Sequence, residues 1–264
     1  MLELKNIYKT FNPGTINEKR ALNGLNLKLN EGDFVTVIGG NGAGKSTMLN
    51  AVAGTWPVDE GQILIDNIDV TKLSEHKRAT YLGRVFQDPM TGTAATMGIE
   101  ENLALAKRRG KSRFLRPGIT KAEREEYKEL LKILGLGLED RLTSKVGLLS
   151  GGQRQALTLL MATLQKPKLL LLDEHTAALD PKTAAKVLEI TDMIVNRDHL
   201  TTLMITHNMK DAIAHGNRLI MMMEGKIILD IQGEDKKKLT VKDLLDQFEH
   251  ASGEEFSNDS ALLG

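Results

Sequence analysis

The 264-residue sequence contains no cysteine, which excludes disulfide bonds, thiolate catalysis and cysteine-ligated zinc. Its 35 lysine and arginine residues balance 35 aspartate and glutamate residues, so only local patches of charge can attract nucleic acid or a membrane. No apolar run approaches the roughly 18 residues that cross a bilayer, and the first residues lack the basic and apolar regions of a signal peptide. We expect a cytoplasmic protein that reaches a membrane only through another chain.

The composition indicates a globular chain with a sizeable core. Hydrophobic residues make up 41% of the sequence and charged residues 27%, which is too balanced for a disordered or collagen-like chain. At roughly 150 residues per domain, the length allows one large domain or two small ones, and it excludes a complete membrane transporter.

The apolar residues follow two strand patterns. Alternation of apolar and polar residues, or a short apolar run between turn residues, indicates half-buried strands and an antiparallel layer near the N-terminus. These segments are residues 2–7, 25–29 and 61–65. Nearly continuous apolar runs are typical of parallel strands that are covered on both faces. These runs are residues 35–38, 169–172 and 202–205.

Helical patterns lie between and after these strands. Apolar residues recur at helical spacing in 153–165 and 181–196, and together with the strands they predict an α/β fold. The segment 88–150 differs, because the helical pattern at 120–134 starts with a capping box and indicates a helical insert. Residues 251–264 are rich in Ser, Gly, Asp and Glu, and we expect them to fray.

A glycine-rich loop carries the clearest chemical motif. Residues 39–46 match GxxxxGK[ST] between the strand predicted at 35–38 and the helical segment 47–53. The glycines let backbone N–H groups face phosphate oxygens, Lys45 contacts the β- and γ-phosphates, and the Ser46 hydroxyl coordinates Mg²⁺. The pattern predicts ATP or GTP binding by Gly39, Gly40, Asn41, Gly42, Ala43, Gly44, Lys45, Ser46 and Thr47.

Two adjacent carboxylates follow the apolar run at 169–172. Asp173 stands at the end of this predicted strand, where the second acidic motif of P-loop NTPases holds the Mg²⁺ shell. Glu174 can orient or deprotonate a water molecule for attack on the γ-phosphate. The alternative is a solvated acidic turn after a core strand.

Residues 149–153, Leu-Ser-Gly-Gly-Gln, form a second helix start that attracts phosphate. Ser150 can cap the helix, while Gly151 and Gly152 expose N–H groups to an anion. One γ-phosphate could use both helix starts only if they came from different subunits or after a large rearrangement. The duplication therefore predicts a nucleotide held between two protomers, although this pentapeptide taken alone could be an ordinary capped helix.

In this order, the motifs resemble the ATP-binding subunits of ABC transporters from residue 2 to about residue 233. The resemblance implies an α/β fold: a P-loop NTPase core with a mostly parallel sheet, an N-terminal antiparallel β layer and an inserted helical subdomain. It implies an ATP-binding core at 1–87 and 160–240, a helical signature subdomain at 88–159, and a C-terminal helix and tail at 241–264.

The resemblance also implies functions for single residues. Phe11 matches an aromatic that stacks on adenine, and Gln87 matches a glutamine that contacts Mg²⁺ and water and links the core to the helical part. His207 matches the histidine that contacts the γ-phosphate. The implied catalytic residues are Glu174, His207, Gln87 and Lys45, and the implied Mg²⁺ ligands are Ser46, Gln87 and Asp173. The second copy closes over the γ-phosphate with Ser150, Gly151 and Gly152. Gln153 completes the matched signature sequence at 148–153, and Asp180 belongs to the loop at 178–180 that matches the one crossing the dimer interface; both are implied nucleotide-binding residues.

Some of these residues have simpler interpretations. Phe11 alone could be a core aromatic, and Asp180 before a proline is a natural helix start. His175 follows Glu174 where the family usually has proline, and Gly40 stands where Pro or Ser is common. We interpret both departures as backbone-level changes without a chemical role.

The implied function is ATP hydrolysis that drives transport of a small solute through a separate permease. The sequence at 174–180 is similar to a subgroup of amino-acid uptake ATPases, which favours import, with aromatic amino acids as one cargo. The implied cofactors are ATP and Mg²⁺. The implied partners are a second copy, a permease docked near Gln87 and 88–105, and a solute-binding protein, with no nucleic acid. The protein is expected at the inner face of the cell membrane.

Two other functions and one surface remain as hypotheses. A non-transport ABC ATPase acting on a ribosome or nucleic acid usually has two cassettes or a long coiled-coil insertion, and neither is present here. A P-loop kinase or GTPase leaves 149–153 unexplained. Residues 107–116 carry six basic side chains, which either face lipid headgroups or an acidic permease loop or form a solvated loop.

Overall fold

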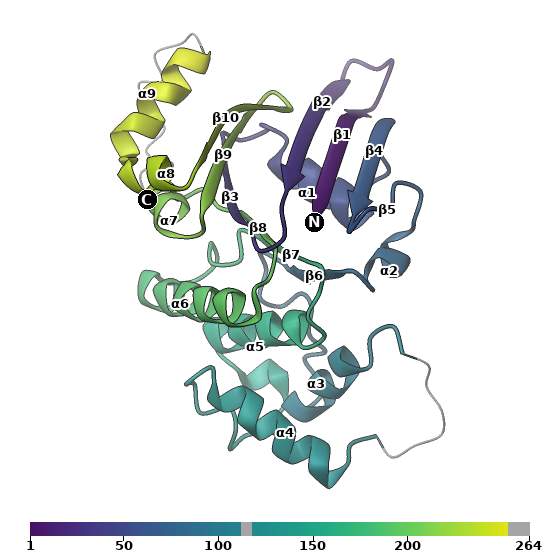
Figure 1. The fold of residues 1–264 in the computed structure, drawn as a ribbon. Helices are drawn as coiled ribbons and strands as arrows, with labels where there is room; N and C mark the ends of the chain where they lie inside the picture. Colours follow the sequence, from purple (N-terminus) through teal and green to yellow (C-terminus); the bar gives the residue numbers. More distant parts are fainter. Residues whose placement is uncertain (112–117, 253–264) are drawn as a thin grey trace.

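The structure is a computed structural model that describes residues 1–111 and 118–252. Two β sheets and their covering helices build it, with the N-terminal sheet at one end and α3 (Ile99–Lys107) and α4 (Lys121–Lys132) at the other (Figure 1). The predicted α/β fold is confirmed. Residues 253–264, most of the segment expected to fray, lie outside the described part of the chain.

The first sheet is the antiparallel layer expected near the N-terminus. Its strands are β1 (Leu2–Phe11), β2 (Lys19–Leu29), β4 (Glu60–Ile65) and β5 (Ile68–Asp69), in the order β2-β1-β4-β5. Leu2, Leu4, Ile63 and Ile65 are buried on one face, as the alternation predicts. Both strands of the first hairpin are longer than predicted, because pairing continues to its end, where Phe11 lies opposite a lysine of β2.

The second sheet is parallel except at one edge. Its strands are β3 (Phe34–Ile38), β6 (Leu82–Val85), β7 (Leu169–Asp173), β8 (Thr202–Ile205), β9 (Arg218–Met223) and β10 (Lys226–Gln232), in the order β10-β9-β3-β8-β7-β6. Only β9 and β10 pair antiparallel. The three apolar runs predicted as parallel strands, 35–38, 169–172 and 202–205, correspond to β3, β7 and β8. Since these strands are parallel, their carboxyl ends lie at one edge, where the segments after β3, β6, β7 and β8 meet.

Helices cover both faces of this sheet and divide the core into three apolar clusters. The helices not yet placed are α1 (Lys45–Ala53), α2 (Glu75–Arg78), α5 (Gly151–Thr163), α6 (Pro181–Asp198), α7 (Met209–Ala214), α8 (Glu234–Lys238), α9 (Val241–Ser252) and the 3₁₀ turn η1 (Val146–Leu148). One cluster joins α1 to both sheets. Another joins the parallel sheet to α3, α4, α5 and α6, and the third packs α7 and α9 against β9.

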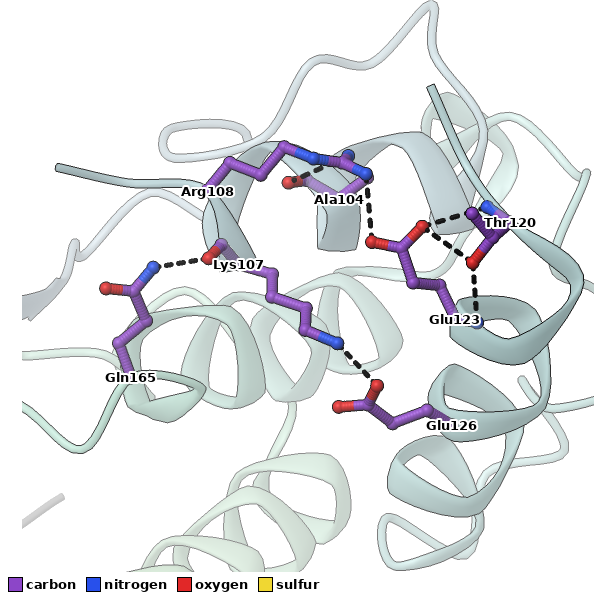
Figure 2. A network of polar contacts seen from close by, with 7 residues as sticks. All are labelled: Ala104, Lys107, Arg108, Thr120, Glu123, Glu126 and Gln165. Atoms are coloured by element: carbon purple, nitrogen blue, oxygen red, sulfur yellow. Dashed lines mark hydrogen bonds and ion pairs between the residues drawn. The ribbon is translucent and has the colours of Figure 1, made fainter. Parts of the chain in front are cut away.

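The helical part is held together by charge as well as by apolar packing. The predicted capping box of α4 is confirmed, with the Thr120 Oγ1 accepting from the Glu123 backbone and the Glu123 carboxylate accepting from the Thr120 backbone at 2.8 Å. Figure 2 shows Lys107 and Arg108 at the end of α3 turned toward α4, where they pair with Glu126 and Glu123. Two cations of the basic segment are therefore engaged within the protein.

Within residues 1–111 and 118–252, no helix combines the length and the apolar character that a membrane crossing requires.

Candidate nucleotide and metal site

The glycine-rich loop lies between the backbones of two other strands. A methyl group at Gly39 would lie 2.2 Å from the carbonyl oxygen of Met222 on β9, and one at Gly44 would lie 2.5 Å from that of Ala21 on β2. Both glycines have positive φ, 149° and 102°, a conformation that side chains disfavour. Only glycine therefore lets the chain make this turn between β3 and α1.

Lys45, the first residue of α1, lies across the loop. Its side chain is largely buried, and Nζ donates to the carbonyl oxygens of Gly39 at 2.6 Å and Gly40 at 3.2 Å. Burial lowers the pKa of the Lys45 ammonium, while the charges of Asp173 and Glu174 act in the opposite direction. The Lys45 ammonium therefore interacts electrostatically with both carboxylates, Asp173 and Glu174.

Asp173 stands at the end of β7 beside Arg84, which no sequence motif indicates as part of the site. Burial raises the pKa of the Asp173 carboxyl, and the charge of Arg84 opposes this rise. The guanidinium Nη2 of Arg84 lies 3.5 Å from Oδ2 of Asp173. A half-buried carboxylate with one long ion pair retains oxygen lone pairs for another cation.

Two of the predicted catalytic residues contact the same carboxylate oxygen of a third, Glu174. Nε2 of Gln87 donates to Oε2 of Glu174 at 3.4 Å, and Nδ1 of His207 lies 3.7 Å from the same atom. Glu174 has a positive φ of 45°, and its backbone N–H donates to the Ile205 carbonyl at 3.0 Å. The loops after β6, β7 and β8 thus bring the Gln87 amide and the His207 imidazole next to the Glu174 carboxylate.

Phe11 lies at the rim of the loop and not in the main core. Its ring meets the ring of Trp56 edge-on, with centroids 5.0 Å apart, and it pairs across the hairpin with Lys19. Nζ of Lys19 lies beside Gly42, 2.8 Å from where a methyl group there would stand. The sequence alone did not indicate Trp56 and Lys19 as part of the site. Lys19 lies near Phe11 because of the register between β1 and β2, and Trp56 lies near it because of where the chain leaves α1.

The helix start at Ser150, the second that the sequence predicts to attract phosphate, forms a regular helix cap. The Ser150 hydroxyl accepts from the Gln153 backbone at 3.3 Å, and the Gln153 side chain accepts from the Ser150 backbone at 3.2 Å. A methyl group at Gly152 would stand 2.0 Å from the Thr183 side chain. Gly152 therefore permits close packing of α5 on α6, whose own cap is Asp180.

Within the described residues, no hydrogen bond or ion pair joins this cap to the glycine-rich loop. One chain thus brings together Lys45, Gln87, Asp173, Glu174 and His207. Among the described residues, no hydrogen bond or ion pair joins the segment 150–153 or Asp180 to that group.

His175, which replaces the expected proline, is completely buried. Its Nε2 lies 3.0 Å from the hydroxyl of Thr191, which itself donates to the Val187 carbonyl. Since the hydroxyl proton is used by this carbonyl, His175 donates through Nε2–H. Burial lowers the pKa of His175 to about 4, and the neutral ring has a packing role on α6.

Residues 22–177 match the family model described as ABC transporter. The chain belongs to the ABC transporter family. It is 45% identical to a tyrosine transport ATP-binding protein of Clostridioides difficile, over 95% of this chain and 100% of that protein. It is 34% identical to a spermidine/putrescine import ATP-binding protein of Haemophilus influenzae, over 87% of this chain and 57% of that protein.

Solved ABC cassettes share the fold. A dimeric ATP-binding cassette in a post-hydrolysis state, bound to ADP and Pi, matches with a TM-score of 0.74 and 32% identity over 88% of this chain and 98% of that chain. The ADP conformation of another ABC transporter cassette matches with a TM-score of 0.77 and 28% identity over 96% and 99%. The chain is accordingly an ATP-binding and ATP-hydrolysing subunit of an ABC transporter.

Proposed function

We propose that this ABC ATPase powers the uptake of an aromatic amino acid, tyrosine first, through a separate permease. The observation that carries the substrate is the 45% identity to a tyrosine transport ATP-binding protein, which extends over the whole of that relative. The 174–180 segment favours the same subgroup. A solute-binding protein that delivers the amino acid and a location at the inner face of the cell membrane belong to this proposal.

We propose that Glu174 orients the attacking water. Its carboxylate has two neighbours, the Gln87 amide and the His207 imidazole, which fix it at the junction of three loops. A carboxylate held in this way accepts the water proton as a general base does. Lys45 and His207 stabilise the negative charge that develops on the transferred phosphoryl group.

The donor set fits Mg²⁺. The Ser46 hydroxyl, the Gln87 amide oxygen and the Asp173 carboxylate are hard oxygen ligands, the type that Mg²⁺ takes alongside phosphate oxygens. Asp173 lies at a strand end, and within the described part of the chain its carboxylate makes one long ion pair, to Arg84. Bound Mg²⁺ supplies charge neutralisation on the β- and γ-phosphates, while the protein residues orient the nucleotide and the water.

Nucleotide contacts come from two copies in this proposal. Phe11 and the loop Gly39, Gly40, Asn41, Gly42, Ala43, Gly44, Lys45, Ser46 and Thr47 bind from one copy. The partner copy closes the site with Ser150, Gly151, Gly152, Gln153 and Asp180. No hydrogen bond or ion pair joins the segment 150–153 to the glycine-rich loop within the described residues of one chain. This supports the arrangement, as does the dimeric cassette with ADP and Pi.

The permease is proposed to dock at a cavity of about 280 Å³ between the core and the helical part. Leu82, Phe86 and Met161 give the cavity an apolar lining, and Arg109 and Glu75 add opposite charges. Within the described residues, no carboxylate pairs with Arg109, so this arginine is available to an acidic residue of a permease helix. The cavity opens beside Gln87 and 88–105, the region proposed for docking from the sequence.

We also propose the division into a core at 1–87 and 160–240, a helical subdomain at 88–159, and a C-terminal segment at 241–264. The boundary near 160 lies inside α5. This helix contacts both β6 of the core and α3 of the helical part, so it joins the two units as a shared element.

Uptake by proteoliposomes tests the proposed function. The ATPase is reconstituted with the permease that copurifies with it, and ATP-dependent entry of labelled tyrosine is measured against entry of methionine and putrescine. We expect tyrosine to enter and to compete with the other aromatic amino acids, and a Lys45→Ala subunit to abolish entry. Preference for methionine or putrescine would contradict the substrate. Ribosome-bound ATPase activity that ignores the permease would contradict transport itself.

A further inference from the structure

Arg84 on β6 makes contacts in three directions. Its Nη2 donates to the Asn50 side chain at 2.8 Å, and its Nη1 donates to the Thr55 hydroxyl at 3.1 Å. Both partners belong to α1 or the turn after it, close behind the glycine-rich loop. The third contact is the 3.5 Å ion pair with Asp173, which is long beside the roughly 2.7–2.9 Å of a charge-assisted hydrogen bond.

Arg84 also lines the cavity beside the helical part. Its carbon Cζ lies 4.6 Å from the centre of the Phe86 ring, and both residues line the cavity. Nε of Arg84 is buried and has no hydrogen-bond partner, although buried donors are normally paired. The Nη atoms of Arg84 are therefore held by hydrogen bonds, whereas its Nε lacks a hydrogen-bond partner.

We propose that Arg84 is a positioning residue that links occupancy of this cavity to the orientation of the Asp173 carboxylate. A helix that enters the cavity presses on Phe86 and moves the planar guanidinium toward Asp173. Because the guanidinium is rigid, the gap to Oδ2 then closes and one carboxylate oxygen is fixed. The other carboxylate oxygen of Asp173, Oδ1, would then remain available as a ligand for a metal ion. That the entering helix belongs to a permease rests on the proposed function. The link between the cavity and Asp173 rests on the contacts of Arg84 alone.

Mg²⁺-dependent nucleotide binding by the purified chain tests the link without measuring turnover. A fluorescent ATP analogue is titrated with Mg²⁺, and the half-saturating Mg²⁺ concentration is read from the binding signal. We expect Arg84→Gln to raise this concentration several-fold and Arg84→Lys to raise it less, while binding in EDTA stays unchanged. Arg197→Gln is the matched control, because Arg197 also pairs with an aspartate but lies on α6 outside the cavity. An unchanged or lower half-saturation in Arg84→Gln would overturn the proposal.

Filling the cavity tests the direction of the link. Ala79→Phe on the rim beside α2, or Ala106→Leu on α3 if the first variant unfolds, places side-chain volume where the permease helix would enter. We expect the filled cavity to lower the half-saturating Mg²⁺ concentration in the wild-type background and to leave it unchanged when Arg84 is Gln. An equal shift in both backgrounds, or no shift in either, would reject Arg84 as the link. Since the permease is absent from this assay, failure here is distinct from failure of tyrosine uptake.

Discussion

Nε2 of Gln87 lies 3.4 Å from Oε2 of Glu174, although the two residues are 87 positions apart in the sequence. Gln87 follows β6 and Glu174 follows β7, and these strands are parallel neighbours. The contact therefore joins the segment that leads into the helical part to the carboxylate proposed to activate water. In the proposed function, a shift of the helical part would change the surroundings of this carboxylate and so connect docking to hydrolysis.

Replacing Glu174 with Gln should separate binding from hydrolysis. The amide cannot accept a proton, so we expect turnover to fall by about 10²–10⁴-fold, the range for loss of a general base. ATP affinity should not change, and ATP should trap a dimer that size-exclusion chromatography detects. Glu189→Gln, on the exposed side of α6, is the control and should hydrolyse ATP at the normal rate. Normal turnover in Glu174→Gln would remove Glu174 from this role.

Ser150 and Thr120 offer a matched pair of helix caps. Both side chains complete capping boxes, on α5 and α4 respectively, so replacing either with Ala should reduce the free energy of unfolding by roughly 1 kcal/mol. Only Ser150→Ala should also slow hydrolysis and weaken the ATP-dependent dimer, because only this cap is proposed to meet a partner's phosphate. Equal ATPase rates in the two variants would show that Ser150 is a cap and nothing more.

Phe11 should contribute to nucleotide affinity through its ring. Phe11→Ala removes a stacking surface and is expected to weaken ATP binding, whereas Phe11→Tyr should preserve it. Trp56, the single tryptophan, has its ring 5.0 Å from that of Phe11, so its fluorescence should report nucleotide binding in the wild type. If Phe11→Ala binds ATP as the wild type does, the ring serves only to pack against Trp56.

The buried His175 should make the protein sensitive to acid. Its pKa is about 4 in the folded protein against an ordinary value of 6.5, so between these values the unfolded chain binds a proton that the folded chain does not. Stability should therefore be fully present above about pH 6.5 and decrease as the pH falls toward 4. In chemical denaturation at several pH values, His175→Gln should show a smaller decrease than the wild type. The exposed His76→Gln should not differ from the wild type, and equal pH profiles for all three proteins would contradict the assignment.

The basic segment should divide into structural and docking residues. Arg108 pairs with Glu123 on α4 at 2.9 Å, so Arg108→Gln should loosen the helical part and lower the melting temperature. Arg109 lines the cavity, and Arg109→Glu should weaken copurification with the permease at little cost in stability. Lys111→Glu, an exposed neighbour, is the control. Arg113 and Arg116 lie outside the described residues, and the lipid-facing hypothesis for them stays a prediction. Equal permease binding by the Arg109 and Lys111 variants would reject docking at the cavity.

Strand prediction succeeded for the three central strands of the parallel sheet and missed β6, β9 and β10. The continuous apolar runs of β3, β7 and β8 identified central parallel strands, because such strands are covered on both faces. The four residues of β6 include a glycine and an arginine, and they become a strand only because β7 pairs beside them. Strands β9 and β10 were missed although β9 is strongly apolar, and pairing with β3 and with each other defines them.

The sequence by itself determined the local chemistry: a loop that only glycine can form, a lysine at the start of a helix, two carboxylates after an apolar run, and caps with fixed three-residue spacing. These features depend on residues that are neighbours in the chain, so short-range rules specify them. Tertiary structure alone decided that Arg84 lies between a cavity and Asp173, and that Trp56 and Lys19 lie beside Phe11 and Gly42. Such contacts depend on strand order and register, which arise only when the whole core packs.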